Sequence, residues 1–175
     1  ITGDIIDNLH LKYWGKIMGF LDFIEKYNVY YVTGNHEYMH DECRNVILEI
    51  EKRKIKVLHG EMVNITRAES IMFVYGIDDP YVFYGENIPA KYKTPHYEFI
   101  QKLSKIKVEK NRFSILLTHR PEFFEYYVES GFNLVLAGHA HGGQWIIPGL
   151  GGVIAPDQGL LPKYVKGKYI KEDTT

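Results

Sequence analysis

The chain has 175 residues, of which 45% are hydrophobic and 25% are charged, which is typical of about one globular domain with a sizeable core and excludes a disordered chain. The formal net charge of −1 lacks the basic excess of a general nucleic-acid binder. No apolar run approaches the roughly 18 residues that span a bilayer, and the single cysteine excludes an internal disulfide framework.

Short apolar runs alternate with segments of helical periodicity along the chain. In chain order, the first half predicts a strand end at 1–2, a helix over 9–27, a strand over 29–33, a helix over 40–54, and strands over 56–58, 62–67 and 71–77. The second half predicts a surface loop over 79–95, a helix over 97–108, a strand over 113–118, a helix from Pro121 to Gly131, a strand over 134–137, and weaker strands at 145–147 and 164–165. The alternation favours one α/β domain over 1–175 with largely parallel strands. A hairpin around residues 68–70 makes the sheets mixed.

Polar residues of one chemical kind follow four of the predicted strands, at Asp4, at Asn35 to Glu37, at His119, and at His139 and His141. If these strands are parallel, all four groups emerge at the same edge of the sheet, where open α/β sheets bind their ligands. The first three groups each have a structural alternative, because Gly3-Asp4 can be a turn, Gly34 to Glu37 a turn with a helix start, and His119 a capping residue. Asp7 can likewise be a helix cap. The histidines among glycines at 138–143 suit neither a core nor a turn. The coincidence of these groups at four strand ends favours a site.

The candidate ligands are oxygen and nitrogen donors, namely Asp4, Asn35, His119, His139 and His141. Three imidazoles, a carboxylate and an amide oxygen suit Mn, Fe or Zn better than Ca. Two histidines at i and i+2 of an extended segment lie on one side, roughly 6.5–7 Å apart at Cα. This spacing suits one histidine for each of two metals about 3.5–4 Å apart. The other histidines, His10, His40, His59 and His96, are expected to be solvated or to cap helices.

Four segments together resemble the calcineurin-like metallophosphoesterase family: Gly3-Asp4-Ile5-Ile6-Asp7, Gly34-Asn35-His36-Glu37, Thr118-His119 and Gly138-His139-Ala140-His141. Three further segments resemble a bacterial subgroup of YkuE/YaeI-type cell-envelope phosphodiesterases: Gly76-Ile77-Asp78-Asp79-Pro80, Gly142-Gly143-Gln144 and Ala155-Pro156-Asp157-Gln158-Gly159. The resemblance implies a four-layer α/β/β/α sandwich with mixed sheets and two divalent metals.

The resemblance also implies a role for each matching residue. Asp4 would bridge both metals. One metal would be completed by Asn35, His119 and His139, and the other would be joined by His141. His36 would act as a general acid or stabilise charge near the leaving group, and Asp7 and Glu37 would orient ligands. Arg120 and Asp78 are the candidates for contact with substrate.

The family pattern extends beyond these residues. It includes an Asp-x-His strand before the Gly-Asp motif and a strand with a Ser-Arg-Gly-type motif after a segment like 163–168, and neither occurs in the 175 residues. We therefore expect an incomplete domain at both ends, with a weakened first metal position and an impaired activity of these 175 residues.

The expected function is hydrolysis of a phosphoester, most simply a phosphodiester or pyrophosphate-linked one, by a hydroxide that two metals activate. Its expected partners are small-molecule, lipid or nucleotide-sugar phosphoesters, with no specific nucleic acid. The alternatives are a metal-deficient scaffold or binding module on the same fold, and a nuclease of the same family. The subgroup implies the membrane or cell envelope as the compartment, with the cytoplasm as the alternative. Metal, substrate and oligomeric state stay open.

Overall fold

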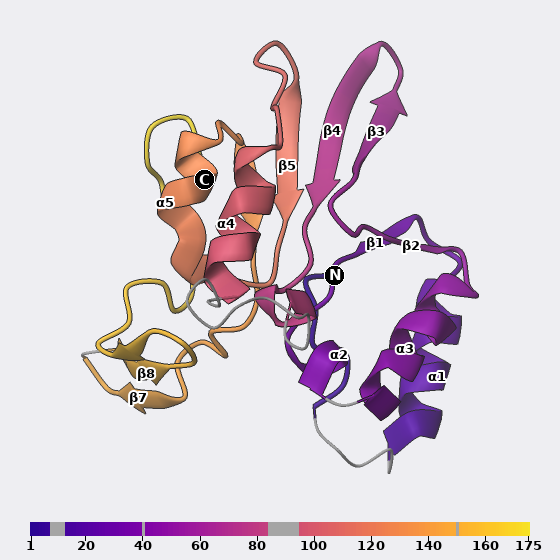
Figure 1. The fold of residues 1–175 in the computed structure, drawn as a ribbon, viewed down its shortest axis with the longest axis horizontal. Coiled ribbons are helices and arrows are strands. Elements are labelled where there is room, and N and C mark those ends of the chain that lie inside the picture. The colour runs from indigo at the N-terminus through magenta and orange to yellow at the C-terminus, as the bar shows by residue number, and fades with distance from the viewer. Residues whose placement is uncertain (8–12, 40, 84–94, 150) are drawn as a thin grey trace.

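The computed structural model describes residues 1–7, 13–39, 41–83, 95–149 and 151–175, and only the backbone of residues 41–43 and 95 (Figure 1). Its helices are α1 (Trp14–Ile24), α2 (His36–Met39), α3 (Asp41–Glu51), α4 (Pro95–Ser104) and α5 (Phe124–Glu129), with short 3-10 helices η2 (Pro80–Phe83) and η4 (Pro121–Phe123). Its strands are β1 (Val29–Tyr31), β2 (Ile55–Val57), β3 (Met62–Arg67), β4 (Ser70–Gly76), β5 (Phe113–Leu117), β6 (Leu134–Leu136), β7 (Trp145–Ile147), β8 (Gly151–Ala155) and β9 (Gly159–Leu160). None of the helices in these ranges has the length and apolar character needed to cross a membrane.

The strands form mixed sheets, as expected from the sequence. β1 and β2 are parallel. An isolated parallel bridge joins Thr2, near the start of the chain, to Val32, the residue after β1. A four-stranded sheet has the order β3-β4-β5-β6, in which β3 and β4 form the predicted antiparallel hairpin and the other pairs are parallel. β7, β8 and β9 form an antiparallel sheet, which Figure 1 shows beside the main body.

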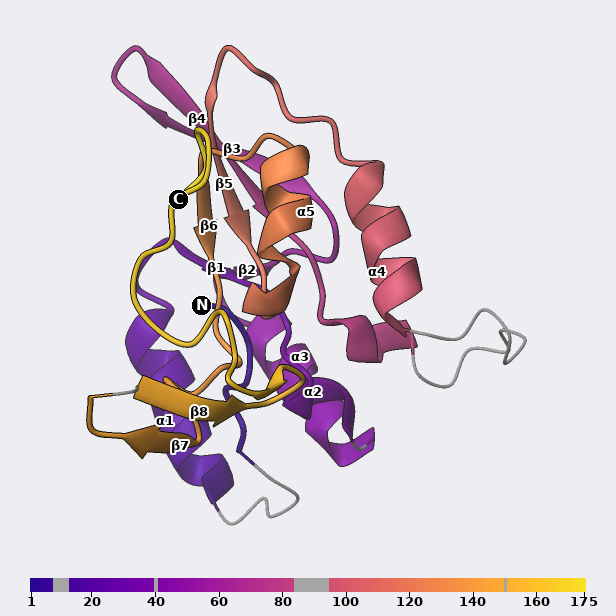
Figure 2. The same cartoon turned by 90° about the vertical axis from the view of Figure 1, so that its left-hand side faces the viewer.

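Three apolar clusters pack the layers together. The face of β4 and β5 that carries Phe73 and Leu116 packs against α4 and α5 through Phe99 and Tyr127, and Figure 2 shows both helices on the same side of these strands. The opposite face of β4 and β5 carries Val74 and Leu117, which pack on Val32 and Leu58 beyond the ends of β1 and β2. A third cluster joins β1 and β2 to α1 and α3. The packing order is therefore helix, sheet, sheet, helix, which confirms the expected four layers.

Most predicted elements are present, with shifted ends. Helix α4 begins at Pro95, two residues before the prediction, and ends at Ser104 rather than near 108. The helix predicted over 9–27 is present as α1, which ends at Ile24. Residues 8–12 of this prediction and 84–94 of the predicted surface loop lie outside the described residues. The helix predicted from Pro121 is η4 followed by α5, and Gly131 follows its end with a φ of +83°.

The strand predicted at 164–165 is wrong. The Gln158 side chain takes the place of a sheet partner there, because its amide donates to the Tyr164 carbonyl oxygen at 2.6 Å and its oxygen accepts from the Tyr164 N–H at 2.9 Å. The ring of Tyr164 is buried against α5 instead. β7 pairs with β8, and β8 pairs with β9, two strands that the glycine-rich sequence after residue 150 did not indicate.

Candidate metal centre

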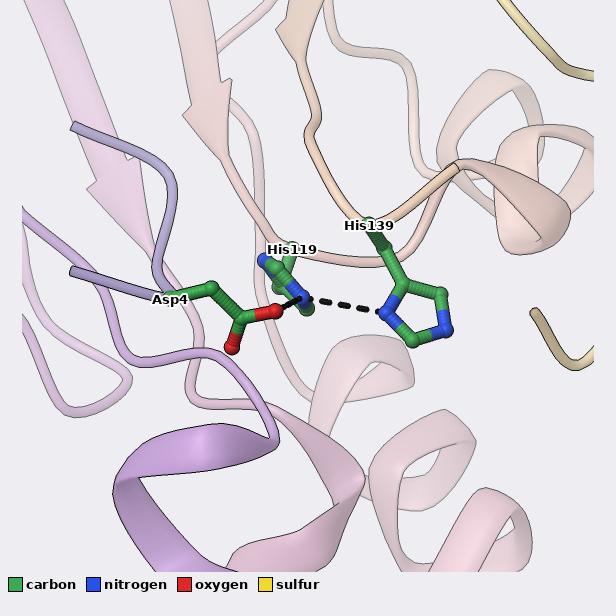
Figure 3. Close-up of side chains that lie close together, drawn as sticks. All are labelled: Asp4, His119 and His139. Atoms are coloured by element: carbon green, nitrogen blue, oxygen red, sulfur yellow. Dashed lines mark hydrogen bonds and ion pairs between the residues drawn. The ribbon is translucent and has the colours of Figure 1, made fainter. Parts of the chain in front are cut away.

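The ends of the parallel strands bring three of the predicted ligands together. Asp4 follows the bridge at Thr2, His119 follows β5, and His139 follows β6. The ligand atoms of these three side chains all lie within 4.8 Å of one another, as Figure 3 shows. They line one side of an open cavity of about 360 Å³, which His141 also lines. The predicted residues thus meet where the carboxyl ends of two neighbouring strands of one sheet lie against the Thr2 bridge of the other.

The atoms at the centre of the cluster lie at hydrogen-bonding distance from one another. His119 Nε2 lies 3.0 Å from Asp4 Oδ2, 3.1 Å from His139 Nδ1 and 3.2 Å from Asn35 Oδ1. Asn35 reaches this point from the loop between β1 and α2. Asp4 and the two histidines therefore surround one small volume, and Asn35 joins them through His119.

A backbone contact sets the tautomer of His119. Its Nδ1 lies 2.6 Å from the carbonyl oxygen of Thr2, and because a carbonyl only accepts, Nδ1 carries the proton and donates. In the neutral ring Nε2 then has a lone pair, which faces Asp4 Oδ2 and Asn35 Oδ1. Asp4 Oδ2 is buried and has no hydrogen-bond partner among the described residues.

This group of acceptors favours a positive charge at its centre. Burial acts to lower the pKa of His119, but the adjacent Asp4 carboxylate outweighs burial and raises it. A proton on Nε2 and a divalent metal are the two ways to supply that charge, and they compete for the same lone pair. A buried carboxylate oxygen without a hydrogen bond, beside imidazole and amide lone pairs, fits Mn, Fe or Zn.

The backbone at the cluster adopts an uncommon conformation. Asp4, His139 and His141 have φ of +53°, +59° and +54°, in the left-handed region that non-glycine residues rarely occupy. Strain of this kind persists where the surrounding structure over-determines it, often at functional sites. Gly34 allows the backbone of Asp4 to approach closely, because a Cβ built at Gly34 would lie 2.7 Å from the backbone nitrogen of Asp4.

Glu37 holds the turn that carries Asp4. This side chain is fully buried, and its Oε2 accepts from the backbone N–H groups of Gly34 and Asp4 at 2.6 and 3.0 Å. Its Oε1 accepts from the N–H of Ile5 at 2.9 Å. Burial acts to raise the pKa of Glu37, and the N–H donors oppose that rise. Glu37 thus joins the start of α2 to the Asp4 turn, the orienting position expected from the sequence.

His36 lies at the edge of the cluster. Its backbone N–H donates to Asp4 Oδ1 at 3.0 Å, and its Nε2 lies 3.9 Å from Asp4 Oδ2. The side chain is 21% exposed, so part of the ring is open to solvent. Its Nδ1 has no hydrogen-bond partner among the described residues. The ring is close enough to reach a group that approaches Asp4 from solvent.

The far side of His139 contacts an ionic group in which Arg120 and Asp79 are buried and Asp157 is 40% exposed. His139 Nε2 lies 2.9 Å from Asp157 Oδ2 and 2.8 Å from Arg120 Nη1. Arg120 also pairs with Asp79 through two of its nitrogens and with Asp157 through Nη1. Burial, and then the charges of Arg120 and His119, lower the pKa of His139 to about 4. His139 is therefore neutral at pH 7, the form that binds metals.

The sequence profile of calcineurin-like phosphoesterases matches residues 1–143. The chain belongs to this family. It is 30% identical to the metallophosphoesterase F40B5.2 of Caenorhabditis elegans over 99% of this chain and 34% of the worm protein. It is 32% identical to the metallophosphoesterase Cj0846 of Campylobacter jejuni over 82% of this chain and 35% of that protein. The metallophosphoesterase YkuE of Bacillus subtilis is 42% identical over 57 residues, 33% of this chain and 19% of YkuE. The chain spans about a third of the length of the first two relatives.

Other residues predicted from the resemblance to calcineurin-like phosphoesterases lie elsewhere. Arg120 is fully buried and bound to carboxylates, so its guanidinium offers no surface to a substrate in this structure. Asp78 is buried in a separate group, where it accepts from Thr33 Oγ1 at 2.8 Å and contacts His59 Nδ1 at 2.9 Å. Asp7 is exposed and makes no hydrogen bond or ion pair with another described residue.

The structure adds two carboxylates that the sequence reasoning did not assign to the site, Asp79 and Asp157. Both lie in segments quoted for the bacterial subgroup, which was the available signal. Their proximity to His139 arises only from the packing of the β8–β9 loop and of the residues after β4 around Arg120.

Proposed function

We propose that the chain carries the metal centre of a phosphoester hydrolase. The observation that supports this most directly is the buried Asp4 Oδ2, which faces the ring nitrogens of His119 and His139. Membership of the calcineurin-like phosphoesterase family points to the same chemistry. Asp4, Asn35, His119 and His139 would hold one divalent ion, Mn, Fe or Zn, and His141 and Asp4 would contribute to a second.

The metals, His36 and Glu37 would have different roles in this function. The chemistry that divalent metals supply at such a site is Lewis acidity toward phosphoryl oxygens and a lowered pKa of water. His36, which is partly exposed beside Asp4, would donate a hydrogen bond to the phosphoryl group or a proton to the leaving oxygen. Glu37 would keep the Asp4 turn in place, since it accepts three backbone N–H bonds.

The proposed substrate is a small-molecule phosphodiester or a pyrophosphate-linked compound. The support is the resemblance of three segments of the chain to YkuE/YaeI-type phosphodiesterases and the absence of a basic excess that would favour a nuclease. The same resemblance implies, within this proposal, a cell-envelope enzyme that acts on lipid or nucleotide-sugar phosphoesters.

The test is hydrolysis of an aryl phosphodiester, bis(p-nitrophenyl) phosphate, by the chelator-treated chain with Mn²⁺, Fe²⁺ or Zn²⁺ added back. We expect weak, metal-dependent turnover, reduced by the weakened first metal position, that Asp4→Ala and His139→Ala abolish and that the exposed control Asp173→Ala retains. Equal turnover in all four proteins would contradict the proposal. A wild-type chain without turnover under any of the three metals would favour the scaffold alternative.

A further inference from the structure

We propose that Asp157 is a positioning residue that keeps the ring proton of His139 on Nε2 and thereby leaves Nδ1 as the metal-binding atom. The inference rests on the metal centre proposed above. It concerns a residue on the far side of His139 from Asp4 and His119, in the loop between β8 and β9. No such role follows from the family profile, which ends at residue 143.

The two nitrogens of His139 face different surroundings. Nδ1 points into the cluster, 3.1 Å from His119 Nε2 (Figure 3). Nε2 points away from it and lies between an acceptor, Asp157 Oδ2 at 2.9 Å, and a donor, Arg120 Nη1 at 2.8 Å. The ring itself is buried, and these two groups are the hydrogen-bonding neighbours of Nε2 among the described residues.

Asp157 and Arg120 favour opposite tautomers of the neutral ring. If Nε2 carries the proton, it donates to Asp157, and the Nδ1 lone pair faces Asp4 and His119. If Nδ1 carries the proton, Nε2 accepts from Arg120, and the Nδ1–H group points at His119 Nε2, where a cation would bind. Only the first tautomer gives His139 a ligand atom at the centre, and Asp157 is the acceptor within hydrogen-bonding distance of Nε2 that stabilises it.

The first tautomer leaves the hydrogen bonds of Arg120 intact. Arg120 does not need His139 as an acceptor, because Asp79 accepts from Nε and Nη2, and Asp157 accepts from Nη1. Glu122 Oε1, 3.5 Å from Nη1, is a further acceptor for the same nitrogen. Without Asp157, an Nε2–H group would have the Arg120 cation as its neighbour at 2.8 Å and the Glu122 carboxylate farther away, within 4.8 Å of the ring. Asp157 Oδ2 can accept from Nε2 and from Nη1 together, which satisfies both donors.

The local fold presents Asp157 in the required place. Ala155 pairs with Gly159 at the end of the β8–β9 ladder, and Asp157 lies in the tight connection between them. Its φ of +53° is a left-handed conformation, which aspartate, asparagine and glycine tolerate better than other residues. The conformation also guides the choice of variants, because asparagine and glycine both suit the backbone at this position.

The test compares Asp157→Asn, which retains an acceptor oxygen, with Asp157→Gly, which removes it, and uses Asp173→Ala as the exposed control. The tautomer of His139 is read in the metal-free proteins from ¹⁵N chemical shifts of the ring. Zinc affinity is measured by competition with a chelating indicator. We expect Asp157→Gly to move the proton to Nδ1 and to weaken zinc binding about 10–100-fold. Asp157→Asn should keep the Nε2–H tautomer and bind zinc within a few-fold of the wild type.

Two results would overturn the inference. One is an Nε2–H ring and unchanged zinc affinity in Asp157→Gly. The other is an equal loss of affinity in both variants with no change of tautomer, which would assign Asp157 a purely electrostatic effect. A wild-type chain that does not bind zinc would contradict the proposed function instead, and the tautomer measurement would still decide the role of Asp157.

Discussion

His119 Nδ1 donates a hydrogen bond to the carbonyl oxygen of Thr2 at 2.6 Å, although 117 residues separate the two along the chain. The bond joins the end of β5 to the bridge that Thr2 forms with Val32. It orients the imidazole so that Nε2 faces Asp4, and thus connects the parallel arrangement of the strands with the chemistry of the cluster. A metal-binding histidine commonly has its other nitrogen bonded in this way.

Removal of the His36 ring should reduce turnover more than metal binding. The ring lies 3.9 Å from Asp4 Oδ2 and is partly exposed, outside the group of converging ligand atoms. For His36→Ala we expect a fall in kcat of about 10²-fold or more, the range of general acid catalysis, with manganese affinity within a few-fold of the wild type. The check is kcat against manganese affinity for the two proteins. A variant that loses both to the same degree would identify His36 as a ligand.

Replacement of the Glu37 carboxylate should destabilise the Asp4 turn. In Glu37→Gln one acceptor oxygen becomes an NH₂ group facing backbone N–H donors in a buried site, which costs about 1–3 kcal/mol in the free energy of unfolding. Urea denaturation measures this cost, with Glu69→Gln in the exposed β3–β4 turn as the matched control. If the two variants have the same unfolding midpoint, Glu37 does not hold the turn.

The four-layer order could be predicted because the family resemblance implies it. His119 and His139 follow neighbouring parallel strands of one sheet, so strand direction alone predicts that they lie together. Asp4 belongs to the other sheet, through the bridge at Thr2, and reaches them because the two sheets pack against each other. Helix ends shifted by several residues because tertiary packing, rather than propensity, decides where the last turn ends. Metal binding by these residues remains a prediction.

The ionic partners of the site could not be predicted from local sequence patterns. Asp79, Arg120 and Asp157 come from three distant segments, and nothing in their local patterns records which charge meets which. His59 was expected to be solvated or capping, but its Nδ1 lies 2.9 Å from the buried Asp78 carboxylate. His10 and His40 lie outside the described residues.

The Arg120–Asp79 pair should show strong coupling in a double-mutant cycle. Both side chains are fully buried, so Arg120→Met leaves an uncompensated carboxylate, at a cost of about 3–5 kcal/mol in the free energy of unfolding. The double variant Arg120→Met with Asp79→Leu removes that unpaired charge and should be more stable than Arg120→Met alone. Urea denaturation of the wild type, Arg120→Met, Asp79→Leu and the double variant gives the coupling free energy. Additive losses in the free energy of unfolding would contradict a buried pair.

The His59–Asp78 contact should make stability depend on pH. The hydrogen bond to Asp78 raises the pKa of His59 above its ordinary value, with further support from Glu51, whose Oε1 lies 3.5 Å from Nε2. Its stabilisation is therefore fully present below the unfolded pKa of about 6.5 and is lost as the pH rises through the folded pKa. The difference in unfolding free energy between wild type and His59→Gln should shrink from about pH 6 to pH 8.5. A stability difference that grows between these pH values would contradict a raised pKa of His59.

The most direct test of the metal centre is the metal content of the purified chain. After equilibration with Mn²⁺ and removal of free metal, elemental analysis of the wild type should find at least one bound ion per chain. Asp4→Ala and His139→Ala should retain far less, because each removes a ligand atom from the cluster of Asp4, His119 and His139. Equal manganese in the wild type and both variants, or none in the wild type, would contradict the account.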